Sequence, residues 1–200
     1  MDTIITNTNI DTTNNMQEVN NDAKIRGFEL VSENNRVTKK FNTLPLKATK
    51  RSGGYDLYCP VDIDIPPQEK VVFSSDIKAY MQPGEILIMA PRSSTGIKHD
   101  LMLANTIVIG DCDFYNNETN EGNYAICLRN LKPEMRLVKY KSIHNNAISE
   151  YYDIENCIEK NTVHIKAGDR VIQAFFVQTL PADSGESKEE RKGGIGSTGK

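Results

Sequence analysis

Short apolar runs alternate with turn-forming residues along most of this chain. The runs are rich in β-branched and aromatic side chains, and they cover residues 28–31, 71–73, 86–89, 106–109, 124–128, 163–165 and 171–180. Proline, glycine, asparagine and aspartate lie between them, as in Pro83-Gly84 and Gly168-Asp169. This spacing suits antiparallel strands and does not suit the helical crossovers of a parallel sheet. The pattern therefore predicts an all-β fold, either a barrel or a double-sheet sandwich.

Two segments depart from this pattern. Residues 1–23 are dominated by asparagine, threonine and aspartate and cannot bury enough apolar surface to offset the entropy of ordering, so we expect a disordered leader. Residues 132–160 are charged and weakly patterned, and the spacing of Ile148, Tyr151 and Ile158 also fits one or two helical turns. We interpret this second segment as an insertion. It is either a surface for a protein partner or a tolerated surface excursion, since long loops cost little extra closure entropy.

The composition indicates one domain that acts on a small partner. The chain has 200 residues, of which 38% are hydrophobic, enough for one sizeable core that we place in residues 24–180. The formal net charge of −3 gives no general attraction to nucleic acid or to an anionic membrane. No apolar stretch approaches the ~20 residues of a membrane span, and the N-terminus lacks the apolar core of a signal peptide. We therefore expect a soluble, cytoplasmic protein. Four cysteines without C-x-x-C spacing predict reduced structural thiols.

Residues 181–200 form a separate C-terminal arm whose last ten residues combine many glycines with two hydroxyls and three cations. Glycine lets backbone N–H groups approach an anion, as at Gly196, and the hydroxyls of Ser197 and Thr198 can donate further hydrogen bonds. The guanidinium of Arg191 can fork onto phosphate oxygens. The arm is thus either a phosphate-clasping segment or a polar tail of linker composition.

Two polar segments between the predicted strands offer further chemistry. Residues 91–96, Pro-Arg-Ser-Ser-Thr-Gly, place a guanidinium and three hydroxyls where a strand ends, which suits an anion but is also typical of an ordinary serine-rich turn. Residues 105–114 place the Asn105 amide at one end of an apolar strand, and Asp111 with Phe114 at the other. An amide can bind a base edge, an aromatic ring can pack on a sugar, and a carboxylate can activate water as a general base. Alternatively, the acidic residues only cap a turn.

Five segments, taken in order, resemble the five motifs of the trimeric dUTP diphosphatase (dUTPase) family. They are residues 54–57, 91–94, 105–114, 168–173 and 193–199, and the resemblance covers roughly residues 25–200. It implies a jelly-roll-like, distorted β-barrel that assembles as a homotrimer. Three active sites would lie between subunits, and the C-terminal arm would close over the bound nucleotide. The implied reaction is hydrolysis of dUTP to dUMP and diphosphate, which removes dUTP and supplies dUMP for dTTP synthesis.

The resemblance also assigns roles to individual residues. Asp111 matches the carboxylate that deprotonates the water attacking the α-phosphate. The uracil and deoxyribose would be bound by Asn105, Gly110, Phe114 and Ile195. The phosphates would be bound by Arg92, Ser93, Ser94, Gln173, Arg191, Gly196, Ser197 and Thr198. Asp56 would help to organise, through water, a Mg²⁺ ion held mainly by the substrate phosphates, because a triphosphate suits a hard octahedral cation that keeps several waters.

The chain departs from the family pattern at several of these positions. Phe114 stands where the family usually has a tyrosine, and Gly110 replaces an apolar residue beside the expected base. Ile195 replaces the aromatic residue of the arm, and Arg191 is one step closer to the glycines than in the family. Some phage-type members carry extra segments at the position of residues 132–160, which is consistent with a phage or prophage origin.

Two other functions fit the same pattern. A dCTP deaminase belongs to the same superfamily, although it needs a differently placed carboxylate and does not usually end in Gly-Ser-Thr-Gly. A nucleotide-gated regulatory protein would use residues 132–160 to bind a protein partner, with nucleotide ordering the arm as a switch.

Overall fold

The structure of this chain is a computed structural model that describes residues 24–144, 147–185, 187, 191 and 193–194. The predicted leader, residues 1–23, lies outside the described residues, and so do the arm positions Ile195, Gly196, Ser197 and Thr198. The described helices are α1 (Ser93–His99) and α2 (Ile158–Asn161), with 3-10 turns η1 (Glu33–Asn35) and η2 (Cys112–Phe114). Neither α1 nor α2 is long and apolar enough to cross a bilayer.

Strands are the predominant secondary structure of the described chain. They are β1 (Gly27–Leu30), β2 (Tyr55–Tyr58), β3 (Ile63–Ile65), β4 (Lys70–Ser74), β5 (Ile77–Tyr80), β6 (Glu85–Pro91), β7 (Leu101–Leu103), β8 (Val108–Asp111), β9 (Ala125–Asn130), β10 (Met135–His144), β11 (Ala147–Asn156), β12 (Val163–Ile165) and β13 (Arg170–Gln178).

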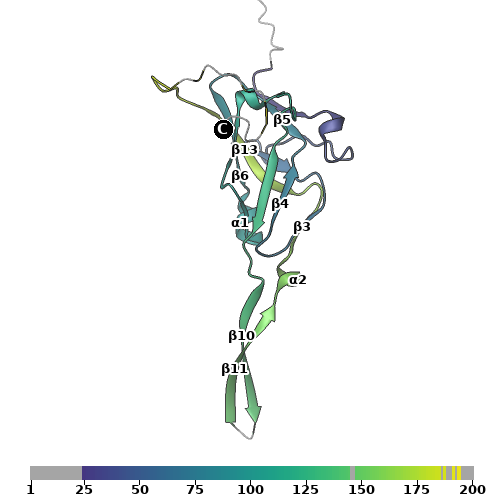
Figure 1. The fold of residues 1–200 in the computed structure, drawn as a ribbon, viewed down its shortest axis with the longest axis vertical. Coiled ribbons are helices and arrows are strands. Elements are labelled where there is room, and N and C mark those ends of the chain that lie inside the picture. The colour runs from purple at the N-terminus through teal and green to yellow at the C-terminus, as the bar shows by residue number, and fades with distance from the viewer. Residues whose placement is uncertain (1–23, 145–146, 186, 188–190, 192, 195–200) are drawn as a thin grey trace, which may run out of the picture.

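The strands pair antiparallel in several sheets. The largest sheet has the order β2-β13-β6-β8, the next has the order β4-β9-β7, and β1-β5, β3-β12 and β10-β11 form two-stranded sheets (Figure 1). The prediction of an all-β fold is therefore confirmed. The barrel is not closed in this chain, because the described strands form separate sheets instead of one continuous ladder.

One hydrophobic core lies between the two largest sheets. Alternate residues of each strand point inward, as at Leu87 and Met89 of β6 and at Ile126 and Leu128 of β9, and all four are at most 1% exposed. This period of two is what a strand with one buried face requires. The thiol of Cys59 lies in the same core, where burial raises its pKa to about 11. It is free, as are the other three cysteines.

Three local predictions need correction. Residues 91–96 do not form the ordinary serine-rich turn that was one of the two alternatives, because α1 begins at Ser93. The Thr95 hydroxyl anchors this helix by a 2.9 Å hydrogen bond to the Val171 carbonyl oxygen. The strand expected at residues 106–109 begins at Val108, because Thr106 has a left-handed φ of 67° inside the preceding turn. The helical alternative for the segment around Tyr151 is wrong, since residues 147–156 are a strand.

The long hairpin β10–β11 extends away from the two main sheets (Figure 1). Directly paired residues share one face of a hairpin. By this register, several exposed apolar side chains lie on one face of the hairpin, namely Met135, Leu137, Ile143, Ile148, Tyr152 and Ile154. Lys139, Lys141 and Glu150 form ion pairs on the same face. Both strands fall within residues 132–160, so the segment predicted as an insertion contains an ordered projection.

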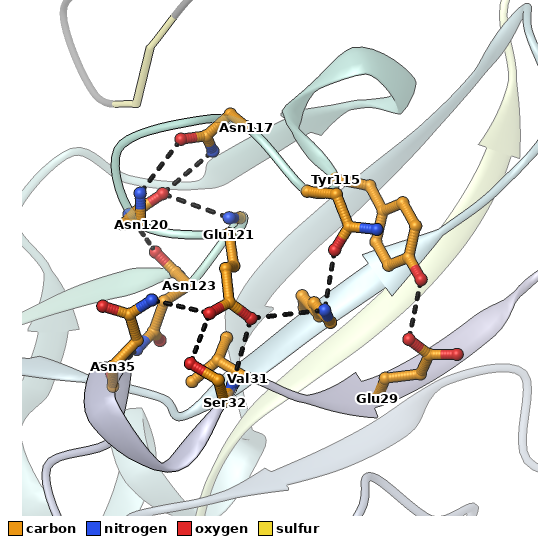
Figure 2. Close-up of polar contacts among 12 residues, drawn as sticks. Glu29, Val31, Ser32, Asn35, Tyr115, Asn117, Asn120, Glu121 and Asn123 are labelled. Atoms are coloured by element: carbon orange, nitrogen blue, oxygen red, sulfur yellow. Dashed lines mark hydrogen bonds and ion pairs between the residues drawn. The ribbon is translucent and has the colours of Figure 1, made fainter.

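A polar network ties the loop at residues 115–123 to the chain just after β1 (Figure 2). The Glu121 carboxylate accepts hydrogen bonds from the Ser32 hydroxyl, from the Ser32 backbone N–H at 3.0 Å and from the Asn35 amide at 2.7 Å. The Lys78 ammonium lies 3.4 Å from the same carboxylate. The hydrogen bonds from Ser32, followed by those from Asn35 and Lys78, lower the pKa of Glu121 to about 2.

We predict that the Glu121 network stabilises the fold above pH 4.5 and that this contribution disappears as the pH falls toward 2. The sign follows because a carboxyl with a depressed folded-state pKa favours folding only while it is ionised. In urea unfolding, Glu121→Gln should be less stable than the wild type at pH 7, and the difference should shrink between pH 4.5 and about 2. The control Glu118→Gln changes an exposed carboxyl of the same loop. A difference that stays constant with pH would contradict the prediction.

Candidate active site

Asp111 and Phe114 lie together where β8 ends. Pairing of β8 with β6 fixes Asp111 opposite Ile86, and η2 then turns the Phe114 ring back toward the core. The Asp111 side chain is 51% exposed, whereas Phe114 is only 5% exposed. The two residues border a pocket of about 200 Å³, together with Val108, Ile109, Tyr124, Ala125 and Arg191. An exposed carboxylate beside an apolar pocket can accept a proton from water next to a bound ligand.

Arg191 of the arm closes one side of this pocket. Its guanidinium donates to the Asp111 carboxylate at 2.6 Å and to the Asp113 carboxylate at 2.8 Å. It also lies over the Phe114 ring, with Cζ 5.7 Å from the ring centroid. The guanidinium therefore occupies the face of Phe114 on which the sequence predicted a sugar. Asp113, to which the sequence assigned no functional role, is a second anchor for this arginine.

The loop after η2 provides another contact with the arm. The Gly194 N–H donates to the Thr119 hydroxyl oxygen at 2.8 Å, and that hydroxyl donates to the Asn117 side-chain oxygen at 2.8 Å. Asn117 is only 8% exposed. Its hydrogen bond therefore holds the Thr119 hydroxyl, which accepts from the arm, in one orientation. The sequence did not predict that this loop binds the arm.

Tyr124, which the sequence did not single out, forms the buried side of the pocket. Its ring packs on Phe114 with centroids 5.0 Å apart, and it is 3% exposed. The phenol lies directly against Gly110, where an added Cβ would be 2.4 Å from the Tyr124 hydroxyl oxygen. The sequence signal that could have indicated Tyr124 is Gly110, which stands where the family has an apolar residue. The space of the missing side chain is filled by another group.

A second cluster forms where β2, β6 and β13 meet. Asp56 is 1% exposed, and its two carboxylate oxygens lie 3.0 Å from Arg92 Nε and 3.3 Å from Arg170 Nη1. Arg92 also donates to the Arg170 carbonyl oxygen at 3.2 Å. Gln173 is the direct strand partner of Asp56. The structure thus brings together three predicted residues, Asp56, Arg92 and Gln173, and adds Arg170.

Ser93 and Ser94 are the first residues of α1, directly after Arg92. Ser94 and Arg92 line a cavity of about 400 Å³ together with Arg170 and residues of β12. Hydroxyls and guanidinium groups at the edge of a cavity are suited to oxygen-rich anions such as phosphate. This cavity is separate from the pocket beside Asp111, with which it shares no lining residue.

Asn105 lies in the turn that leads from β7 to β8, and it is exposed. The Thr106 N–H donates to the Leu103 carbonyl oxygen at 3.0 Å, and the Ile107 N–H donates to the Asn105 carbonyl oxygen at 2.7 Å. The turn connects the two largest sheets, because β7 pairs with β9 and β8 pairs with β6. The Asn105 side chain has no hydrogen-bond partner recorded among the described residues.

The described residues contain no group of three His, Cys, Asp or Glu side chains that could hold a metal ion. Asp56 does not provide an open ligand, since its buried oxygens face two arginines. Asp111 and Asp113 both face Arg191. The described part of the chain therefore offers no protein cage for Mg²⁺.

The two clusters lie at opposite ends of β6. Asp111 pairs with Ile86 near the start of this strand, and Arg92 follows its last residue. From residue 86 to residue 92 the chain advances six positions in extended conformation. At about 3.3 Å per residue, the backbones of Asp111 and Arg92 are roughly 20 Å apart.

An all-β fold with an exposed carboxylate beside one pocket, and with guanidinium and hydroxyl groups at the edge of another cavity, is the arrangement of an enzyme suited to an oxygen-rich anionic ligand. Residues 40–128 match the profile of the dUTPase family. The chain is 38% identical over 181 residues to the deoxyuridine 5′-triphosphate nucleotidohydrolase of Lactococcus lactis, covering 88% of this chain and 99% of that protein. The chain belongs to the dUTPase family.

Solved structures agree with this assignment. A dUTPase from Streptococcus mutans is similar with a TM-score of 0.57 and 29% identity, over 79% of this chain and 99% of that one. A mutant dUTPase from phage phi11 of S. aureus, described with a structural Mg(II) ion, shares the fold with a TM-score of 0.55 and 21% identity, over 83% and 98% of the respective chains.

We predict that Gly110→Ala destabilises the protein by about 1–3 kcal/mol, as expected when a well-packed site is overfilled. The new Cβ would lie 2.4 Å from the Tyr124 hydroxyl oxygen, and the buried ring has little room to move. Gly53→Ala is the matched control, because an added Cβ there meets nothing within 4 Å. Chemical denaturation of both variants measures the difference. Equal stability of the two variants would show that Tyr124 does not fill the space beside Gly110.

Proposed function

We propose that this protein hydrolyses dUTP to dUMP and diphosphate, with Asp111 as the general base. The observation that supports this most directly is the exposed Asp111 carboxylate at the mouth of the pocket formed with Phe114. Asp111 would accept a proton from a water molecule whose oxygen attacks the α-phosphorus. The bond from that phosphorus to the bridging oxygen of the diphosphate would then break, and diphosphate would leave.

The pocket supports binding of the nucleoside beside this base. Phe114 offers an apolar ring for the deoxyribose, and the exposed Asn105 amide has donor and acceptor groups for the uracil edge. A 2′-hydroxyl would meet the ring, so ribonucleotides should be poor substrates. Asn105 and Gly110 lie at the two ends of the same short segment. This placement would bring the uracil and the deoxyribose to one side of β8.

Arg191 would exchange partners when nucleotide binds. The Arg191 guanidinium donates a 2.6 Å hydrogen bond to the Asp111 carboxylate and so occupies an oxygen that the attacking water would need. The phosphates of dUTP present more negative charge than two carboxylates, and a guanidinium binds phosphate oxygens in the same forked manner. We infer that Arg191 leaves Asp111 for the phosphates. The arm would then close over the nucleotide at the same time as the Asp111 carboxylate becomes free to act.

Mg²⁺ enters this proposal as an ion held by the triphosphate. When bound, it supplies charge neutralisation on the departing diphosphate and one fixed conformation of the phosphates. The chain would provide Ser93, Ser94, Arg92 and Gln173 on the phosphate side. Asp56 would act on the arginines, because burial between Arg92 and Arg170 fixes the direction of both side chains.

We further propose that the active site lies between subunits of a homotrimer. A general base acts within about 3 Å of the proton it removes, directly or through one water. Asp111 and Arg92 of one chain have backbones roughly 20 Å apart along β6, which is too far for both to serve one α-phosphate. Association of chains in a closed ring would bring Asp111 of one subunit to the serines and arginine of another.

A second function is favoured by the hairpin. Its exposed apolar face, with Leu137 and Ile154 at its base, would be covered by a protein partner in a nucleotide-gated regulator. Such a regulator would bind dUTP with little or no hydrolysis. A dCTP deaminase would instead release ammonia from dCTP and leave the triphosphate intact.

Asp111→Asn should lower the rate of diphosphate release from dUTP by about 10²–10⁴-fold while dUTP still binds, because the amide cannot accept the proton. Rates for dUTP, dTTP, dCTP and UTP, with and without Mg²⁺, test the substrate and the base together. Asp113→Asn is the matched control, since Asp113 also holds Arg191 but is not the proposed base. Equal losses in both variants would assign the effect to arm binding, and a fully active Asp111→Asn would refute the mechanism.

Mixing two impaired variants should restore activity if the site is shared. One variant is Asp111→Asn and the other combines Ser93→Ala with Ser94→Ala, so each lacks a different half of the site. Random assortment into trimers leaves about one quarter of the sites with both halves intact, so roughly a quarter of wild-type activity should return after unfolding and refolding together. Mixing without unfolding is the control. Activity no higher than the sum of the separate variants would contradict a shared site.

A further inference from the structure

The hydroxyl of Tyr124 is buried and has no hydrogen-bond partner among the described residues, and the Tyr124 side chain lines the pocket beside Asp111. Tyr124 is 97% buried, being 3% exposed. A buried hydroxyl without a partner costs free energy, and such groups in folded proteins usually have a reason. The cost is increased here by Gly110, because glycine is an unfavourable residue within a strand.

The local electrostatics keep this hydroxyl protonated. Burial, followed by the negative charge of Asp111, raises the pKa of Tyr124, and Arg191 only partly opposes the effect. A neutral phenol can donate one hydrogen bond. Tyr124 is therefore a permanent donor in the pocket, placed between the Phe114 ring and the backbone of Gly110.

We propose that Tyr124 is a substrate-binding residue whose hydroxyl donates a hydrogen bond to the 3′-oxygen of the bound deoxyribose. The proposal rests on the proposed function of this pocket. If the sugar lies on Phe114, the sugar oxygens are the ligand atoms closest to the neighbouring Tyr124 ring, whose centroid is 5.0 Å away. Of these oxygens, O5′ is esterified and O4′ belongs to the ring, so the 3′-hydroxyl is the best acceptor.

The pairing of Gly110 with Tyr124 explains how the phenol reaches this place. Any Cβ at position 110 would lie 2.4 Å from the hydroxyl oxygen and 2.6 Å from Cε1, so only glycine admits the ring. The ring then brings a hydroxyl to the buried side of the pocket, whereas Phe114 itself has none. The specificity of this site for the sugar would thus depend on two positions that are distant in sequence.

The test compares Tyr124→Phe with Tyr115→Phe. The Tyr115 hydroxyl donates to Glu29 at 2.7 Å and lines no part of the pocket, so its removal should lower stability and leave nucleotide affinity unchanged. Removing the unpaired Tyr124 hydroxyl should leave the stability of the nucleotide-free protein unchanged or raise it.

Nucleotide affinity is measured as Kd for the α,β-imido analogues of dUTP and of 2′,3′-dideoxyUTP, so that binding is scored even if hydrolysis is absent. Tyr124→Phe should weaken binding of the dUTP analogue roughly two- to tenfold, the range of one neutral hydrogen bond, and leave the dideoxy analogue unaffected. The kcat for dUTP should change little. Equal weakening of both analogues, no weakening of either, or a loss of kcat at constant Kd would overturn the proposal. A wild type that binds but does not hydrolyse dUTP would refute the proposed function alone.

Discussion

The pairing of β6 with β13 on one side and with β8 on the other is the constraint on which both halves of the site depend. The ladder with β13 brings Gln173 and Arg170 to the Arg92 end of the strand, next to Asp56 of β2. The ladder with β8 fixes Asp111 at the opposite end. Because a strand cannot shorten, this register separates the proposed base from the proposed phosphate-binding residues within each chain. Our proposal that several chains share one site rests on this separation.

Charge placement explains how a protein with net negative charge can bind a triphosphate. Arg92 and Arg170 are held by a buried carboxylate, and Arg191 is held by two exposed ones. Each guanidinium is thus fixed in position before any ligand arrives, which reduces the entropy that binding has to overcome. In the proposed mechanism this difference in burial gives the arginines different roles, since Arg191 would exchange its exposed partners for phosphate and the arginines on buried Asp56 would stay in place.

Much of the fold and part of the site could be predicted from the sequence. The alternation of apolar residues identified β4, β6, β9 and β13, and the order of the motifs gave Asp111 its expected role. The three-residue strands β3 and β7 were not among the predicted runs, although β12, of the same length, was. The helix α1 was not predicted because its Ser-Ser-Thr-Gly start has low helix propensity, and the Thr95 bond to β13 that anchors it is a tertiary contact.

The contacts that define the pocket could not be predicted, because they join residues far apart in the sequence. Arg191 meets Asp111 across 80 positions, and Tyr124 meets Gly110 only after the chain has passed through η2 and the loop at 115–123. The central claim is that one nucleotide is bound by two or more copies of the chain. A crystal structure of the protein with α,β-imido-dUTP and Mg²⁺ tests this most directly. The account predicts that the nucleotide beside Asp111 of one copy contacts Ser93 and Ser94 of another, whereas contacts with both from a single copy would contradict it.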